Sequence, residues 1–471
     1  MTAADRPLTA TLADWIAGTR YGDLPTQAIK FATDAITDCV GVALAGTREP
    51  LAPLLMSTLL TMEGPSAQGC HLLGTSRLAT LTDAALYNGT VAHALDYDDI
   101  NHPAYSHPTA HLMPTLFALA ENTLVSGADI ILAYCVGFEL QGKFGRSLNV
   151  GEGIPHLQGH YARGWHPTGT FGALSSAGAG ARLLRLDASG VRRTLGVAGT
   201  AACGLRASFG TMSKPLNAGL AARNGAMAVQ LGGAGFTSAE DILEDRFGFM
   251  SVLSDGGWTK TPFDQVGQPW EITTEYGLAL KPYPACGATH PAIEAALAIQ
   301  RELPTEPIAS VYVGHNEVMP SVLVYNDPLT PLEGKFSMPF CVAAALVTGE
   351  VNIATFSDGM IADPRIRELI GKTTLHIDDR VRLNPEHGAV VRVRMQSGIE
   401  IERFVELAKG KPARWMTHED LFEKFSDCAL PTLGAAGTRK VFELLQRLPA
   451  LESIAPVFSG LGDALNTANG R

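Results

Sequence analysis

The sequence lacks the features that assign a protein to nucleic acid or to a membrane. It has no run of Lys and Arg long enough to follow a phosphate backbone, and its net charge is −11, so nucleic acid is not an expected partner. Its apolar stretches are shorter than the roughly 20 residues that cross a bilayer, so no membrane is expected either. No apolar segment follows Met1 as it does in a signal peptide, and we therefore expect a cytoplasmic protein.

Motifs of nucleotide binding and of serine hydrolysis are absent as well. The chain has no GxGxxG fingerprint, no phosphate-binding loop and no GxSxG turn. Its seven cysteines are scattered, odd in number and never spaced as CxxC, which favours a reducing compartment over a disulfide framework. Dinucleotide-dependent, NTP-dependent and serine-hydrolase functions are therefore excluded.

The sequence is rich in core-forming residues, with 46% hydrophobic and 18% charged residues. Such a composition argues against disorder, and 471 residues exceed one ordinary core. Apolar residues recur with the helical period up to about residue 265, and the period returns from Thr417. Between them, Val390–Met395 and Ile399–Leu407 flank Ser397-Gly398 as the strands of a β-hairpin do.

These patterns predict a mainly α fold with a smaller α+β domain. Residues 1–268 and 409–471 are expected to form one large all-helical domain, and residues 269–408 an α+β domain inserted into it. The segment Thr168–Leu184 is crowded with small residues, which let helix backbones approach closely, so we place it in the middle of the helical domain.

Chemically useful side chains are concentrated between His93 and His166, where seven of the thirteen histidines lie. Asp96, Asp98 and Asp99 fall within four residues, and their mutual repulsion predicts at least one displaced pKa. An acidic loop that caps the next helix is the simpler alternative. A metal site is another, because His102, His107 and His111 with the aspartates are of ligand type, although no HExxH spacing is present.

Further along the chain, isolated cations and one histidine stand in unusual settings. His166 precedes Pro167-Thr168, where a helix dipole would lower its pKa and let it act as a base. Lys214 lies among small and apolar residues, and Lys281 precedes a stiff Pro-Tyr-Pro segment. Each of these residues is as often structural as functional. Cys286 has no base beside it in sequence and is expected to be a small buried residue.

Taken together and in order, five segments resemble the MmgE/PrpD family, whose members include 2-methylcitrate dehydratase, cis-aconitate decarboxylase and iminodisuccinate epimerase. The resemblance implies a homodimer, a large helical domain with a smaller α+β lid, an active site between the two, and no metal or organic cofactor. The matching segments are Asn88–Asp99, Gly164–Thr168, Ser213–Pro215, Lys281–Pro284 and Gly334–Ser337.

The resemblance also implies the site residues. As catalytic residues it gives Asp96, His107, His166, Lys214 and Tyr325, and as substrate-binding residues we expect Lys281, Cys286, His290 and Arg163. In this scheme the two lysines pair with substrate carboxylates, and Tyr325 forms a hydrogen bond with the substrate. One of His166 and His107 is the base and the other is the acid, while Asp96 orients an imidazole.

Two positions depart from the family pattern. Ile100 stands where the family often has a Thr or Ser hydroxyl, and Cys286 stands where the decarboxylase branch has a histidine. We therefore expect an acid–base enzyme acting at carbon next to a carboxylate of a small di- or tricarboxylic acid, most simply a 2-methylcitrate dehydratase-like hydro-lyase. The alternatives are an iminodisuccinate-type epimerase, a cis-aconitate-type decarboxylase, a metal-dependent hydrolase, and a non-catalytic carboxylate-binding protein.

Overall fold

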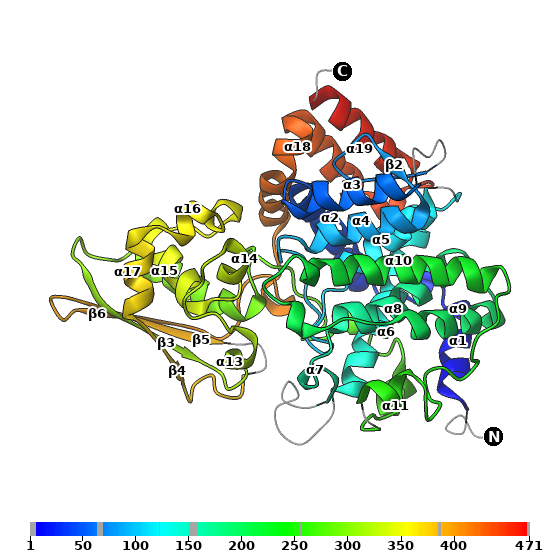
Figure 1. The fold of residues 1–471 in the computed structure, drawn as a ribbon, viewed down its shortest axis with the longest axis horizontal. Helices are drawn as coiled ribbons and strands as arrows, with labels where there is room; N and C mark the ends of the chain where they lie inside the picture. Colours follow the sequence, from blue (N-terminus) through cyan, green and yellow to red (C-terminus); the bar gives the residue numbers. More distant parts are fainter. Residues whose placement is uncertain are drawn as a thin grey trace.

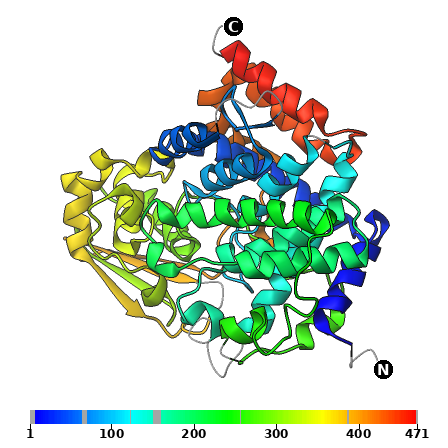
Figure 2. The same cartoon turned by 45° about the vertical axis from the view of Figure 1, so that its right-hand side comes forward.

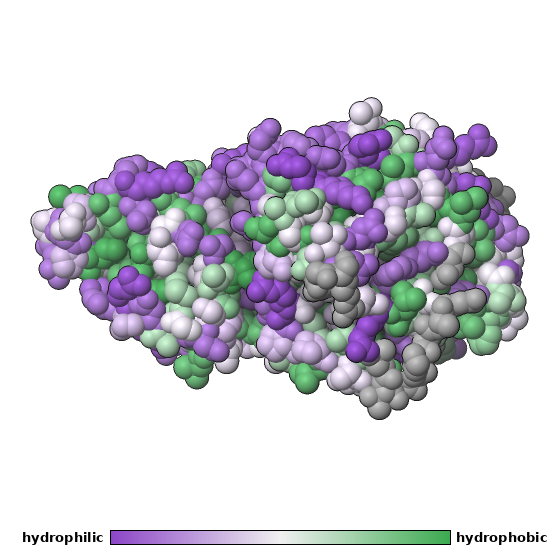
Figure 3. Space-filling view, turned by 90° about the horizontal axis from the view of Figure 1, so that it is seen from above, coloured by the Kyte–Doolittle hydropathy of each residue, from purple (hydrophilic) through white to green (hydrophobic). Residues whose placement is uncertain are grey.

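The computed structural model describes residues 6–63, 69–121, 123–149, 159–254, 256–384 and 388–468. Two units lie side by side, a large helical one and a smaller one that holds a sheet (Figures 1 and 2). The mainly α fold with a smaller α+β unit is thereby confirmed. No helix in these ranges is long and apolar enough to cross a membrane, and polar side chains are spread over both units on the face that Figure 3 shows.

The large unit is built almost entirely from helices. Its elements are α1 (Leu8–Gly18), α2 (Thr26–Gly46), α3 (Leu51–Glu63), β1 (Cys70–His71), β2 (Leu78–Ala79), α4 (Leu81–His93), α5 (Thr109–Ala120), α6 (Gly127–Leu148), α7 (Gly159–Ala162), α8 (Pro167–Leu183), α9 (Ala188–Ala201), α10 (Ser213–Gly233), α11 (Phe249–Ser254), α18 (His418–Gln446) and α19 (Ala455–Ala468).

At the centre of this unit α10 packs against α4 and α8. Small residues make the close approach possible, because a Cβ added to Gly219 on α10 would lie 2.2 Å from Oγ1 of Thr90 on α4. A Cβ on Gly225 would likewise lie 2.4 Å from Cβ of Ser176 on α8. The prediction of a small-residue helix in the middle of the domain is confirmed, since nearly all of α8 is buried. This tight packing fixes the helix ends that carry the site.

The smaller unit combines a four-stranded sheet with short helices. The strand order is β4-β3-β5-β6; β3 and β4 are parallel, and the other two pairs are antiparallel. Helices α15 and α17 lie over one face of the sheet (Figure 1). The elements are α12 (His290–Gln300), β3 (Ile308–His315), α13 (Met319–Val322), α14 (Pro331–Gly334), α15 (Met338–Thr348), α16 (Asp358–Ile361), α17 (Pro364–Lys372), β4 (Thr373–Ile377), β5 (Ala389–Met395) and β6 (Glu400–Val405).

The predicted hairpin is present in this sheet. Strands β5 and β6 pair in antiparallel register, with Val391, Val393 and Met395 buried and Arg392 paired with Glu402. The returning helix α18 begins with the expected capping box, in which Thr417 and Asp420 bond reciprocally. It is kinked at Gly434, whose φ of 65° is left-handed.

Each unit has its own hydrophobic core. The larger core contains residues from Leu8 to Leu280 and again from Met416 to Leu465, whereas the smaller core contains residues from Ala285 to Met395. The chain therefore stays with the helical unit beyond the predicted boundary at 268/269. Lys281 lies where the chain leaves one core for the other, so its position depends on both.

Candidate active site

The loop between α4 and α5 carries three aspartates, and each has different partners. Asp99 faces the start of α5, where it accepts hydrogen bonds from the backbone N and the hydroxyl of Thr109 at 3.0 and 2.7 Å. Burial raises the pKa of Asp99 to about 8. The helix-capping alternative is therefore correct for this one aspartate. Beside it, Ile100 forms an antiparallel bridge with Ala279, which ties the loop to the segment that leads to Lys281.

Asp96 lies between two buried lysines that are distant in sequence. Its Oδ1 is 2.7 Å from Nζ of Lys214, at the start of α10, and 2.9 Å from Nζ of Lys281. Burial opposes ionisation of Asp96, but the two ammonium groups outweigh it and hold the pKa of this carboxyl well below its usual value. Asp96 does not orient an imidazole as we expected, because Nε2 of His107 is 3.9 Å from Oδ1, beyond hydrogen-bond distance.

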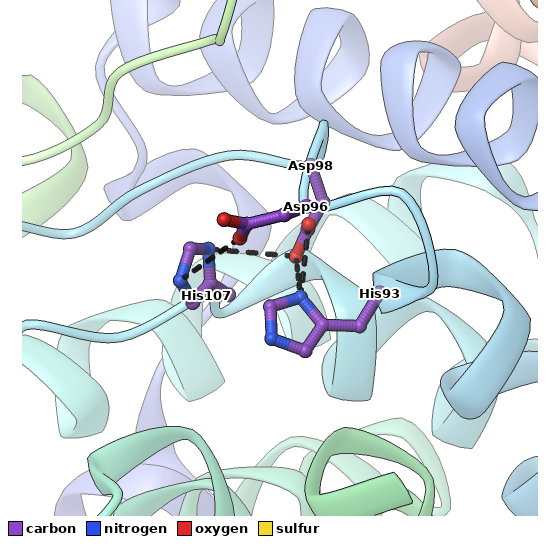
Figure 4. A group of neighbouring side chains, drawn as sticks. All are labelled: His93, Asp96, Asp98 and His107. Carbon is purple, nitrogen blue, oxygen red and sulfur yellow. Dashed lines mark hydrogen bonds and ion pairs between the residues drawn. The ribbon is translucent and has the colours of Figure 1, made fainter. Parts of the chain in front are cut away.

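The carboxylate that does orient an imidazole is Asp98, and its partner is His93 (Figure 4). Nδ1 of His93 is 2.9 Å from both oxygens of Asp98, and both side chains are fully buried. Burial lowers the pKa of His93 well below its ordinary value. In the neutral ring the proton is on Nδ1, and Nε2 has no hydrogen-bond partner in the described part of the chain.

His107 has the tautomer of a general base. Its Nδ1 is 2.8 Å from the backbone carbonyl of Asp99, which can only accept, so Nδ1 carries the proton and Nε2 offers a lone pair. Burial and the ammonium of Lys281 lower the pKa of His107 well below its ordinary value. The ring is therefore neutral near pH 7 and able to accept a proton.

His166 has the opposite tautomer. It is the N-cap residue of α8, and its Nδ1 is 3.0 Å from Nδ2 of Asn217, which lies one turn after Lys214 on α10. An amide NH₂ only donates, so Nδ1 of His166 is the acceptor and Nε2 carries the proton in the neutral ring. Burial and Lys214 lower the pKa of His166 well below its ordinary value.

These residues surround one cavity that has a charged and an apolar side. Lys214 also contacts aromatic faces, with Nζ 5.4 Å from the ring centroid of Phe209 and 5.1 Å from that of Phe336. The cavity is lined by Asp96, Ile100, His102, Tyr105, His107, Tyr161, His166, Phe209, Lys214, Lys281, Cys286, Gly287, Ala288, Val322 and Phe336.

The structure brings most of the expected site residues to this cavity and leaves three beside it. Tyr325 lies behind the wall, where its hydroxyl donates to the carbonyl of Phe209 at 3.4 Å. His290 is buried, with Nε2 3.1 Å from the carbonyl of Ala285, and burial lowers its pKa to about 3. Arg163 is exposed in the turn between α7 and α8. Cys286 does line the cavity, and burial raises the pKa of its thiol to about 11.

Sequence reasoning missed several contributors. His93 and Asp98 are part of the Asn88–Asp99 segment, but their pairing depends on the turn at Asp96, whose φ is 52°. The amide of Asn217 could have been found from its position three residues after Lys214 on one helix face. Phe209 comes from a loop that no local pattern marks.

Four of the side chains have the composition of a metal site. Ligand atoms of His93, Asp96, Asp98 and His107 lie within 4.8 Å of one another. However, the two ammonium groups that Asp96 already binds, at 2.7 and 2.9 Å, repel a further cation at that carboxylate. The charge around this group suits an anion better than a metal ion.

The histidines proposed for a metal-dependent hydrolase do not form that set. His111 points into the core, with Nδ1 2.9 Å from the hydroxyl of Ser176, and Nε2 of His102 contacts the ammonium of Lys411. Neither joins the four-residue group among the described residues.

Comparisons with known proteins match both units. The family model for the MmgE/PrpD N-terminal domain matches residues 10–261, and that for the MmgE/PrpD C-terminal domain matches residues 283–448. A cis-aconitate decarboxylase of Aspergillus terreus (strain NIH 2624 / FGSC A1156) is 26% identical over 477 residues, which cover 96% of this chain and 95% of that protein. A human cis-aconitate decarboxylase is 26% identical over 462 residues, which cover 95% of this chain and 93% of that protein.

Proposed function

The chain belongs to the MmgE/PrpD family, and on that premise we propose that it transfers protons at a carbon next to a carboxylate of a di- or tricarboxylic acid. The observation that carries the proposal is the lysine pair. Lys214 and Lys281 share a single carboxylate oxygen of Asp96 beside two neutral imidazoles. The surplus positive charge of this buried pair binds a substrate carboxylate and stabilises the enolate-like charge that develops when the neighbouring proton leaves.

The two tautomers support one assignment of the acid and the base. Nε2 of His107 has the lone pair that removes the proton from carbon, and Nε2 of His166 has the proton that a leaving group requires. Before substrate binds, the lysines disfavour a charged imidazole. Once substrate carboxylates neutralise the lysines, the proton affinity of His107 rises, so substrate binding itself prepares the base. General acid–base catalysis contributes about 10²–10⁴-fold, and the lysine electrostatics supply a further share.

As the specific reaction we propose elimination of water, in the manner of a 2-methylcitrate dehydratase. His107 takes the proton from the carbon next to a carboxylate and becomes an imidazolium. His166 gives its Nε2 proton to the leaving hydroxyl and becomes an imidazolate near the Lys214 ammonium, and a carbon–carbon double bond forms as water departs. Support comes from the complementary tautomers, because water loss needs one acceptor and one donor. Cys286 counts against decarboxylation, because it lines the cavity at a position where the decarboxylase branch has a histidine.

Decarboxylation is the second candidate, and it is favoured by the similarity to two cis-aconitate decarboxylases. The apolar wall formed by Phe209, Val322 and Phe336 would remove a carboxylate from water, which favours loss of CO₂. His166 would then protonate the carbon that CO₂ leaves. The two candidates use the same lysines and differ in which substituent faces the apolar wall.

The test is an incubation in D₂O with 2-methylcitrate, citrate, cis-aconitate and iminodisuccinate, each followed by NMR. Water loss from 2-methylcitrate supports the dehydratase, CO₂ loss from cis-aconitate supports the decarboxylase, and inversion at carbon supports the epimerase. Turnover of none of these, with no deuterium incorporation, would reject acid–base catalysis and favour a carboxylate-binding protein. Activity lost on chelation and restored by zinc would instead favour the metal-dependent hydrolase.

We also propose that the protein works as a homodimer, as the family resemblance implied. Sedimentation equilibrium at the concentration of the activity assay tests this directly. A mass equal to one 49.8 kDa chain would refute it.

A further inference from the structure

Three consecutive backbone carbonyls in the loop after α4 each accept a hydrogen bond from a different buried lysine. We call this arrangement the lysine clamp. Its pairs are Lys335 with Leu95 (2.6 Å from Nζ to O), Lys281 with Asp96 (2.9 Å) and Lys424 with Tyr97 (2.8 Å).

The lysines of the clamp come from separate parts of the fold. Lys335 follows α14 in the smaller unit, Lys281 lies between the two cores, and Lys424 is on α18 of the large unit. They are 3%, 1% and 6% exposed, respectively. The short loop that carries Asp96 is therefore held by one lysine from each unit and by one from the segment between the two cores.

Lys335 is the member whose presence most needs an explanation. Lys424 pairs with the carboxylate of Asp38, and Lys281 pairs with that of Asp96. By contrast, the hydrogen bonds that the Lys335 ammonium makes in the described part of the chain go to backbone carbonyls, those of Leu95 and of Pro284, the latter at 3.3 Å. The carboxylates of Glu49 and Asp96 attract the Lys335 ammonium without a hydrogen bond to it, so part of the cost of burying this charge remains, which a merely structural role would not require.

The clamp acts on a strained position. Asp96 has a φ of 52°, in the left-handed region that residues with a side chain rarely adopt. Fixing the carbonyls of residues 95 to 97 holds this conformation, and the conformation places the Asp96 carboxylate between Lys214 and Lys281. Lys335 itself does not line the cavity.

We propose that Lys335 is a positioning residue of the reaction. Its ammonium holds the Leu95 carbonyl, which keeps Asp96 in its left-handed conformation. The Asp96 carboxylate in turn keeps Lys214 and Lys281 in position relative to His107. The proposal rests on the proposed function for its catalytic consequence. The geometric part, that Lys335 orders the loop, can be tested without any substrate.

The kinetic test compares two substitutions at one position. Lys335→Ala removes three methylenes and the ammonium, and n-propylammonium has the size to refill that space. Lys335→Met fills the space without a charge. We expect both variants to lower kcat at least tenfold with KM within threefold, and added n-propylammonium to restore Lys335→Ala saturably but not Lys335→Met. If kcat per folded enzyme stays within threefold of the parent, or if n-propylammonium rescues both variants, the proposal is wrong.

The substrate-free test is hydrogen–deuterium exchange of the segment 94–107. Lys335→Ala should speed exchange there at least tenfold, and n-propylammonium should slow it again. Lys372→Ala is the matched control, because Nζ of Lys372 also donates to a carbonyl, that of Ile308 at 2.8 Å, but far along the smaller unit on α17. A parent protein without turnover would reject the proposed function alone, whereas unchanged exchange in Lys335→Ala would reject the clamp.

Discussion

Replacing Asp96 with Asn tests the electrostatics of the site most directly. Asn tolerates left-handed backbone as well as Asp does, so the φ of 52° at this position is kept. The substitution removes the one carboxylate that both Lys214 and Lys281 share, at 2.7 and 2.9 Å. Two ammonium groups at most 5% exposed are then left facing each other without that compensation.

The expected cost follows from this burial. Breaking a buried ion pair by removing one partner costs about 3–5 kcal/mol, because the remaining charge stays desolvated. Because the entropy of unfolding grows with chain length, each kcal/mol shifts the melting temperature of a 471-residue chain by about 1 °C, so it should fall by roughly 3–5 °C. A polycarboxylate bound in the cavity can supply the negative charge that Asp96→Asn removes. Citrate at about 100 times its Kd stabilises by about 2.7 kcal/mol, so it should recover at least half of the loss.

The assay is thermal unfolding of both proteins with and without citrate. The control is Asp363→Asn, which removes the same charge from a pair with the exposed Arg365 and should shift melting by no more than about 1 °C. We expect citrate to stabilise Asp96→Asn more than the parent, because no carboxylate competes for the lysines. Melting of Asp96→Asn within about 1 °C of the parent, or equal stabilisation of both by citrate, would refute the lysine-pair argument.

Three further predictions follow from the same structure. His166→Ala and Lys214→Ala should each lower turnover at least a hundredfold in a folded protein. His166→Ala should still exchange the substrate α-proton in D₂O, because His107 remains. Near-normal turnover in both variants would contradict the assignments. Cys286→Ala should keep turnover within fivefold, since burial raises the thiol pKa to about 11, and a hundredfold loss would show a nucleophile. Burial lowers the pKa of His111, His160 and His290 to about 3, so these rings stay neutral in the folded protein and gain protons on unfolding below about pH 6.5. The free energy of unfolding should therefore fall by about 2 kcal/mol per histidine from pH 7 to pH 5. A urea midpoint that does not change between these pH values would contradict this.

Local sequence patterns predicted much of the fold for reasons that the structure makes visible. The hairpin of β5 and β6 was predictable because one face is buried and the other carries paired charges, which imposes strict alternation. The capping box at Thr417 and the small-residue helix α8 were predictable because caps and close helix contacts restrict residue type at fixed spacing.

The different partners of the three aspartates could not be predicted in this way. Spacing places Asp96, Asp98 and Asp99 together, but the left-handed turn at Asp96 decides which carboxylate faces which partner. That turn depends on Lys335 and Lys424, which lie 240 and 327 residues from the carbonyls they hold. Such long-range contacts leave no local pattern, and the role of orienting an imidazole therefore falls to Asp98 and not to Asp96.

The charge balance of the cavity explains how a chain of net charge −11 can bind a polyanion. The buried ammonium groups of Lys214 and Lys281 interact with the buried carboxylates of Asp96 and Asp98, and that of Lys335 interacts with Asp96 and with the partly exposed Glu49. Burial raises the pKa of Asp99 to about 8, so this carboxyl is mostly protonated at neutral pH. The neighbouring imidazoles are neutral too, which leaves a buried surplus of positive charge. Because an uncompensated buried charge is costly, the site has its lowest free energy when an anion occupies it, and a second carboxylate on the same substrate adds to that gain.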